Sequence, residues 1–272
     1  MSSIDELFKS LRAERRKALM PFITAGDPDL DFTAAVLGEL VARGADMCEL
    51  GIPYSDPIAD GPVIQASYTR ALSRHVKLAQ ILDMVRGARA KLTAPIVTMV
   101  SYAIVLRHGP ERYVADAQAA GIAGAIVPDL PAEESKQLAA ICRAADFSLI
   151  QLVAPTTPRE RALRIAATSS GFLYYVSVTG ITGERTALPQ DLIDNVSWLR
   201  GQTELPICIG FGISQPEHVR KLAPVADGLI VGSAIVRRMA ETDTKPREQV
   251  VREIGEYVAG LVAALPVGQG SP

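Results

Sequence analysis

Eight apolar runs, most of them followed by an amphipathic segment, constrain the fold of this chain more than any other feature of its sequence. Continuous apolar runs of this length are typical of strands buried on both faces of a parallel sheet. We expect strands at 18–24, 46–52, 95–101, 123–128, 148–154, 172–178, 206–211 and 228–232. Helical patterns lie between or after them, at 30–43, 77–91, 110–120, 133–145, 158–169, 189–200, 215–223 and 246–264. The alternation predicts an α/β fold of the (β/α)8 TIM-barrel class.

A doubly wound sheet is the alternative, because Gly210-Phe211-Gly212 superficially resembles a dinucleotide-binding turn. That turn lacks a third glycine and belongs to the seventh strand rather than the first, which favours the barrel. The length of 272 residues suits one barrel, so we expect a single domain over residues 1–272.

The two ends of the chain are expected to differ. Residues 1–15 contain a charged, helix-like segment whose apolar residues share one face: Ile4, Leu7, Phe8 and Leu11. This pattern predicts an additional N-terminal helix that covers the bottom of the barrel. Residues 268–272 are expected to form a frayed tail.

Charge and composition exclude several classes of partner. The net charge is −2 and no basic run appears, so nothing in the sequence indicates nucleic acid or an anionic membrane. We find no stretch of about 18 apolar residues and no signal-peptide pattern, so no membrane span is expected. Cys48, Cys142 and Cys208 lie in apolar runs without metal or redox spacing. They are typical of reduced core cysteines in a cytoplasmic protein.

A single carboxylate, Glu49, interrupts the second apolar run. A buried and unpaired acid costs free energy, so Glu49 is either neutralised by a partner or retained for chemistry, and we favour chemistry. The run ends in a loop whose prolines restrict the backbone and which contains Asp56 and Asp60. A carboxylate at the end of a strand and a second one on a stiff loop can face each other across a pocket. This arrangement suits general acid–base catalysis.

In a barrel of this class the site lies at the carboxyl ends of the strands. After strands 7 and 8, Gly212, Gly232 and Ser233 would present free backbone N–H groups, which predicts a phosphate site. Four aromatic residues near the same rim would wall an apolar part of the substrate: Phe22, Tyr102, Tyr174 and Phe211. No lysine falls at the carboxyl end of a strand, which argues against an imine-forming aldolase. The three histidines, at 75, 108 and 218, lack ligand spacing, so no metal is expected.

The stretch from Glu49 to Pro62, followed by Ile64-Gln65, resembles the signature of the tryptophan synthase alpha chain family. The resemblance extends to 21–28, 128–131, 174–177, 180–183 and 210–213, and so covers nearly the whole chain. It implies a (β/α)8 barrel that cleaves indole-3-glycerol phosphate to indole and glyceraldehyde 3-phosphate. It also implies an alpha2beta2 complex with a beta chain, which carries pyridoxal phosphate, whereas this chain would hold no cofactor.

Carried over by position, the resemblance implies that Glu49 and Asp60 are the catalytic pair. It implies that the phosphate site includes Gly183, Gly212, Gly232 and Ser233, and that Thr182 belongs to a loop that closes over the ligand. Asp56 and Pro57 match a surface that faces the beta chain. In this chemistry Glu49 would protonate the indole ring at C3 and then take the proton of the glycerol hydroxyl, which requires a pKa near the working pH. Asp60, near the ring N–H, would stabilise the cation.

Two other interpretations of the sequence remain open. One is another phosphate-binding TIM-barrel enzyme, such as a sugar-phosphate isomerase. The other is a non-catalytic or weakly catalytic subunit that mainly activates its partner. Turnover of indole-3-glycerol phosphate by the isolated chain, with and without a beta chain, separates them.

Overall fold

Eight parallel strands close into a barrel in which each strand pairs with its neighbours in the chain and β8 pairs with β1. The structure is a computed structural model that describes residues 2–57, 60–176, 190–210 and 212–266. The strands are β1 (Ala18–Thr24), β2 (Cys48–Gly51), β3 (Ile96–Met99), β4 (Ile122–Ile126), β5 (Ser148–Val153), β6 (Leu173–Val176), β7 (Ile207–Gly210) and β8 (Gly228–Val231). The TIM-barrel prediction and its eight strand positions are confirmed, and the doubly wound alternative is wrong.

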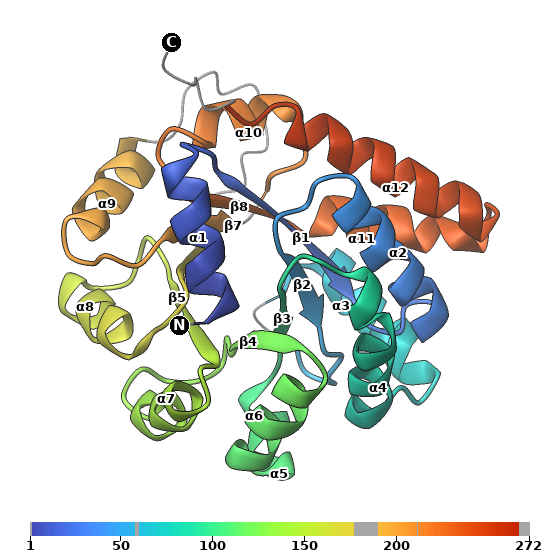
Figure 1. Cartoon of the computed structure of the whole chain (residues 1–272), viewed down its shortest axis with the longest axis horizontal. Coiled ribbons are helices and arrows are strands. Elements are labelled where there is room, and N and C mark those ends of the chain that lie inside the picture. The colour runs from blue at the N-terminus through green and yellow to red at the C-terminus, as the bar shows by residue number, and fades with distance from the viewer. Residues whose placement is uncertain (1, 58–59, 177–189, 211, 267–272) are drawn as a thin grey trace.

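Helices surround the barrel (Figure 1). Those that the sequence predicts are α1 (Ser3–Ala13), α2 (Leu30–Ala42), α4 (Leu78–Ala88) with the short helix η1 (Arg89–Lys91), α6 (Pro110–Ala119), α7 (Ser135–Ala144), α8 (Arg159–Thr168), α9 (Gln190–Arg200), α10 (Pro216–Leu222) and α12 (Arg247–Val262). The structure adds α3 (Pro62–Ser73), α5 (Tyr102–His108), α11 (Ser233–Met239) and η2 (Ala240–Asp243).

The three additional α-helices have physical reasons for being hard to foresee. The prolines before α3 predict a loop, and Pro62 continues that pattern. The helix nevertheless begins at Pro62, because the N–H that proline lacks has no partner within the helix at this first position. α5 and α11 have seven residues each, too few for a helical pattern to repeat.

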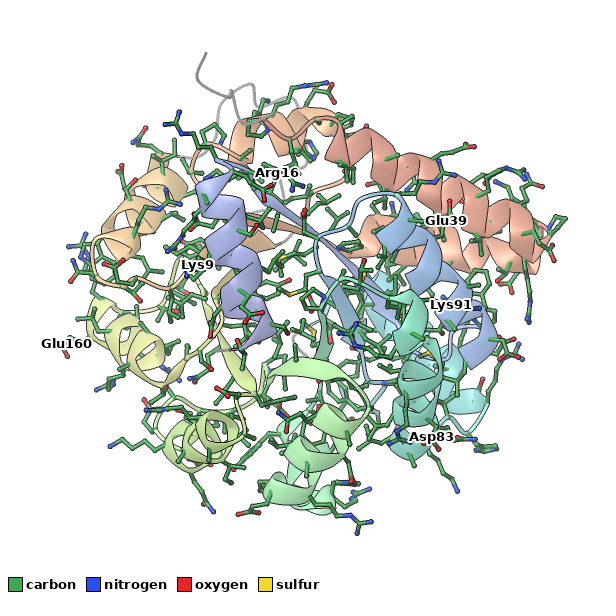
Figure 2. All side chains as sticks on the ribbon, in the orientation of Figure 1. Lys9, Arg16, Glu39, Asp83, Lys91 and Glu160 are labelled. Atoms are coloured by element: carbon green, nitrogen blue, oxygen red, sulfur yellow. The ribbon has the colours of Figure 1, made fainter. Side chains whose placement is uncertain are left out.

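Alternate residues of the strands face two different cores. In β1, Met20 and Phe22 point into the barrel, whereas Leu19 and Ile23 pack outward against the helices. This period of two follows from the strand geometry and explains why the apolar runs are continuous. Charged side chains such as Asp83 and Glu160 project from the helices away from the barrel (Figure 2).

The N-terminal helix α1 covers one end of the barrel, as the sequence predicts. Its buried residues Ile4, Phe8 and Leu11 belong to the inner core, and the Phe8 ring lies 6.0 Å from that of Phe172. In Figure 1, α1 lies across the ring of strands. It covers the amino ends of the strands, because Phe172 directly precedes β6. This leaves the carboxyl ends for a site.

The three cysteines are buried and unpaired by any disulfide. Burial raises the pKa of Cys48 and of Cys142 to about 12. In the part of the chain that the structure describes, no helix is both long and apolar enough to cross a membrane. The tail expected at 268–272 lies outside the described residues.

Candidate active site

A cavity of about 390 Å³ opens at the carboxyl ends of the strands. This volume is within the range of small-molecule sites. Its lining includes residues from the ends of several strands and from the loops and helices that follow: Phe22, Glu49, Asp60, Met99, Pro128, Leu152, Tyr174, Val176, Gly212, Ile213, Ile230, Gly232, Ser233 and Arg237. The cavity therefore brings together the two carboxylates that the sequence singles out.

Glu49 lies in the middle of β2 and is fully buried. It pairs in register with Phe22 of β1 and Val97 of β3, so neighbouring strands hold its backbone on both sides. Among the described residues, none hydrogen-bonds to either oxygen of its carboxyl group. Burial, and to a smaller extent the charge of Asp60, raises the pKa of Glu49 to about 8. An acid with no structural partner that faces a cavity is expected to serve chemistry.

Asp60 reaches the same cavity from the chain between β2 and α3, and a side chain of α3 holds the backbone of Asp60 and of Pro57. The Gln65 side-chain amide of α3 donates to the backbone oxygens of Asp60 and Pro57, at 2.8 and 3.2 Å. The Asp60 N–H donates to the Pro57 carbonyl at 3.1 Å. Burial raises the pKa of the Asp60 carboxyl to about 6, and a hydrogen bond from the Tyr54 hydroxyl opposes this rise.

The two carboxyl groups therefore differ in protonation near neutral pH. With a pKa of about 8, Glu49 holds its proton at pH 7, whereas Asp60, with a pKa of about 6, is largely ionised. Two acids whose environments separate their pKa values in this way can take the roles of proton donor and electrostatic stabiliser.

The wall next to the carboxylates is apolar and aromatic. Phe22 and Tyr174 line it, as the sequence predicts, together with Met99, Leu152 and Ile230, which the sequence did not single out. Tyr174 can lie against β7 because Gly210 has no side chain, and a Cβ there would collide with the Tyr174 ring and hydroxyl. Such a wall suits a flat aromatic group.

Small and polar residues also line the cavity. Gly212, Gly232 and Ser233, the predicted phosphate residues, all line the cavity. Arg237 of α11 lines it as well and is the one cationic side chain among the described lining residues. Arg237 was not predicted from the sequence because α11, the helix that carries it, was not predicted. The register of that helix, counted from Ser233 at the strand end, could have revealed it.

Several predicted residues lie elsewhere or cannot be located. Tyr102 begins α5 half-buried, its N–H donating to Asp129 at 2.7 Å, and it is not among the lining residues, so its ligand contact stays a prediction. Asp56 is exposed and accepts a hydrogen bond from Ser55, and Pro57 is half-buried. Thr182, Gly183 and Phe211 lie outside the described residues.

The described residues include no group of three or more His, Cys, Asp or Glu side chains that could hold a metal ion. The histidines have local roles instead, for example His108, which bonds to Asp116 at 2.7 Å. Asp27, buried near the end of β1, forms a two-point ion pair with Arg70 and so is not free for catalysis. Among the described residues that line the cavity, Glu49 and Asp60 are the acids available to a ligand.

Comparisons with known proteins agree with this geometry. The sequence profile of the family described as tryptophan synthase alpha chain matches residues 8–265. A tryptophan synthase alpha chain of Rhodopirellula baltica is 58% identical over 277 residues, covering 97% of this chain and 99% of that protein.

Solved structures are similar over the same extent. A Legionella pneumophila tryptophan synthase subunit alpha is 35% identical with a TM-score of 0.88, covering 97% of this chain and 98% of that one. A chain of Mycobacterium tuberculosis tryptophan synthase is 32% identical with a TM-score of 0.88, covering 99% of both chains. With the profile spanning nearly its whole length and relatives this close, the chain belongs to the tryptophan synthase alpha chain family.

Proposed function

We propose that Glu49 and Asp60 are the catalytic groups with which this chain cleaves indole-3-glycerol phosphate, the reaction of its family in tryptophan biosynthesis. One observation carries the proposal. Glu49 is fully buried, yet within the described residues its carboxyl oxygens have no hydrogen-bond partner, and it lines a cavity shared with Asp60. A group left in this state by the fold is available to a substrate.

The reaction is a retro-aldol cleavage. Protonated Glu49 gives its proton to C3 of the indole ring, which becomes a cation and can accept electrons. The resulting Glu49 carboxylate then takes the proton of the hydroxyl next to the breaking bond. The C–C bond breaks, its electron pair returns to the ring, and glyceraldehyde 3-phosphate and indole separate. Glu49 ends in its initial protonated state, so the proton balance closes.

Asp60 has an electrostatic role in this scheme. As a carboxylate near the ring N–H, it stabilises the positive charge that develops when C3 is protonated. Its pKa of about 6 supports this role, because the group is mostly ionised at pH 7. The pKa of about 8 supports the opposite starting state of Glu49. The scheme needs both states at once.

The residues that line the cavity support an assignment of the two ends of the substrate. The indole ring binds against Phe22 and Tyr174, beside the carboxylates. The phosphate binds at Gly212, Gly232 and Ser233, which line the cavity together with Arg237, whose side chain supplies a positive charge. Under this proposal the chain needs no cofactor of its own.

The family relation supports a beta-chain partner, since relatives of this chain occur in structures of tryptophan synthase. We propose that this chain joins a beta chain as an alpha2beta2 heterotetramer in the cytoplasm, and that the beta chain binds pyridoxal phosphate. Asp56, exposed on the loop that ends at Asp60, and Pro57 would face that partner. A protein that docks there could shift the catalytic loop.

Turnover of indole-3-glycerol phosphate by the purified chain tests the proposal, with and without the beta chain. We expect release of both products by the chain alone and faster release with the beta chain, whereas Glu49→Gln should lose at least ~100-fold. Activity with a sugar phosphate and none with indole-3-glycerol phosphate would reveal a different barrel enzyme. Turnover in the complex that survives Glu49→Gln would indicate an activating subunit.

A further inference from the structure

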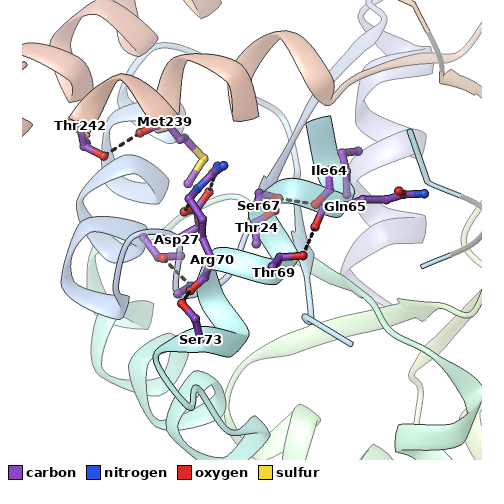
Figure 3. A network of polar contacts seen from close by, with 12 residues as sticks. Thr24, Asp27, Ile64, Gln65, Ser67, Thr69, Arg70, Ser73, Met239 and Thr242 are labelled. Atoms are coloured by element: carbon purple, nitrogen blue, oxygen red, sulfur yellow. Dashed lines mark hydrogen bonds and ion pairs between the residues drawn. The ribbon is translucent and has the colours of Figure 1, made fainter. Parts of the chain in front are cut away.

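Polar contacts anchor α3 to the end of β1, as Figure 3 shows. Arg70 forms two hydrogen bonds to the buried Asp27 carboxylate, at 2.9 and 2.7 Å. One turn earlier, the Ser67 and Thr24 hydroxyls lie 2.6 Å apart, and Ser67 also donates to the Ile64 carbonyl at 2.7 Å. These contacts lie on both sides of Tyr68 along the helix. They fix the position from which its side chain leaves α3.

The Tyr68 side chain enters the barrel and is completely buried in the inner core. A Cβ on Gly51 would lie 2.7 Å from the Tyr68 hydroxyl and 2.6 Å from Cζ of Phe22, so Gly51 leaves the space that this hydroxyl occupies. Gly51 and Glu49 are two residues apart on β2, and side chains at this spacing point to the same face of a strand. The hydroxyl therefore lies over the strand face from which Glu49 projects.

The electrostatic surroundings agree with this position. Burial raises the pKa of Tyr68 well above its usual value, and Asp60, Tyr54 and Glu49 add to the rise. The hydroxyl therefore keeps its proton and can only act as a donor toward a carboxylate. In the part of the chain that the structure describes, neither this hydroxyl nor the Glu49 oxygens have a hydrogen-bond partner. The Tyr68 hydroxyl is thus a buried donor without an acceptor, and the Glu49 oxygens, like Asp60 Oδ2, are buried acceptors without a donor. The position of the hydroxyl over the strand face of Glu49 favours Glu49 as its acceptor.

We propose that Tyr68 is a positioning residue for Glu49, and that its hydroxyl donates a hydrogen bond to the Glu49 carboxylate during the reaction. The inference rests on the proposed function, in which Glu49 becomes ionised after it protonates the indole ring. At that moment a negative charge lies in a fully buried place and needs a donor. The Tyr68 hydroxyl donates a hydrogen bond to the charged carboxylate and so orients it for the second proton transfer.

Tyr68→Phe tests this role, because it removes the hydroxyl and keeps the ring. A hydrogen bond to the ionised form lowers the pKa of an acid, so its loss raises the pKa of Glu49. We expect kcat to fall about tenfold, the usual worth of a hydrogen bond to a charged group. KM should change less than twofold. The basic limb of the kcat–pH profile should move up by about one pH unit, and a ¹³C NMR titration of the Glu49 carboxyl should show the same shift without turnover.

Tyr175→Phe is the matched control. This tyrosine is equally buried, but its hydroxyl lies outside the barrel, near Asn195 of α9, so its loss should leave kcat and the pH profile unchanged. A folded Tyr68→Phe protein with the wild-type kcat, profile and Glu49 titration would overturn the inference. If that variant does not fold, 3-fluorotyrosine at position 68, a stronger donor, should move the basic limb down, and an unmoved limb would overturn the inference equally. Loss of activity in Glu49→Gln separates these outcomes from failure of the proposed function, which full activity in Glu49→Gln would show.

Discussion

Replacing Glu49 by glutamine should make the protein increasingly stable relative to the wild type as the pH rises, and it should remove most of the activity. Burial raises the pKa of Glu49 from its ordinary value of 4.5 to about 8. Between these two pH values the folded protein keeps a proton that the unfolded chain has lost, so the free energy of unfolding falls as the pH rises. At about 1.4 kcal/mol per pH unit, this loss is about 3 kcal/mol at pH 7 and about 5 kcal/mol above pH 8.

Glutamine at position 49 has no proton to lose, so this pH-dependent cost disappears. The buried amide has a cost of its own, but that cost is the same at every pH. The difference in unfolding free energy, variant minus wild type, should therefore rise by up to about 1.4 kcal/mol per pH unit from pH 5.5 and level off above pH 8. Turnover should fall at least ~100-fold, because an amide cannot transfer the proton.

Urea unfolding followed by circular dichroism from pH 5.5 to 9 measures this difference, with steady-state turnover measured in parallel. Glu256→Gln, a change of an exposed carboxyl group on α12, is the control, and its difference should stay within about 0.5 kcal/mol at all pH values. A Glu49→Gln difference that does not depend on pH would refute the raised pKa. Near-normal turnover would refute the catalytic role separately.

Three further changes, one of them with a control substitution, have distinct expected results. Asp60→Asn should lower kcat at least tenfold and move the Glu49 ionisation to lower pH, because the negative charge that raises it is removed; an unmoved pH profile would contradict this. Gly51→Ala should destabilise the protein by about 1–3 kcal/mol in urea unfolding, since the new Cβ collides with Phe22 and Tyr68. Gly38→Ala, which meets nothing within 4 Å on α2, should be neutral or stabilising, and equal effects at both sites would refute the packing argument. Arg237→Gln should raise KM for indole-3-glycerol phosphate several-fold with little change in kcat, as expected for a contact kept throughout the reaction, and steady-state kinetics with an unchanged KM would exclude the phosphate contact.

The barrel was predictable because its evidence is repeated along the chain. Each strand is a continuous apolar run, and the period of a buried parallel strand differs from that of a helix. That Glu49 is a buried acid that lines the cavity was equally predictable, because one acid inside such a run conflicts with its apolar surroundings. α5 and α11 were not, because one or two turns of helix hold too few residues to show a period.

The site could be predicted only in part, for a related reason. Sequence order identifies which residues follow a strand, and this was enough to find Gly212 and Gly232. Sequence order does not tell which of those residues make structural contacts instead of lining the site. Asp27 is such a residue, because it forms an ion pair with Arg70. Nor does it show residues that arrive from a helix, as Tyr68 and Arg237 do. Whether such a residue reaches the site depends on the orientation of its helix about the helix axis, and the local sequence pattern does not determine that orientation.

The burial of all three cysteines makes the chain a reporter of its own unfolding. A thiol reacts with alkylating agents as the thiolate, and a pKa of about 12 leaves almost no thiolate at Cys48 or Cys142 near neutral pH. Their reaction must therefore wait for an opening of the fold, and Cys48 on β2 and Cys208 on β7 lie on separate strands of the ring. The labelling rate at each position then measures how often that side of the barrel opens, and it does so without an added probe. It also means that a single cysteine introduced on the surface can be labelled selectively in the native protein.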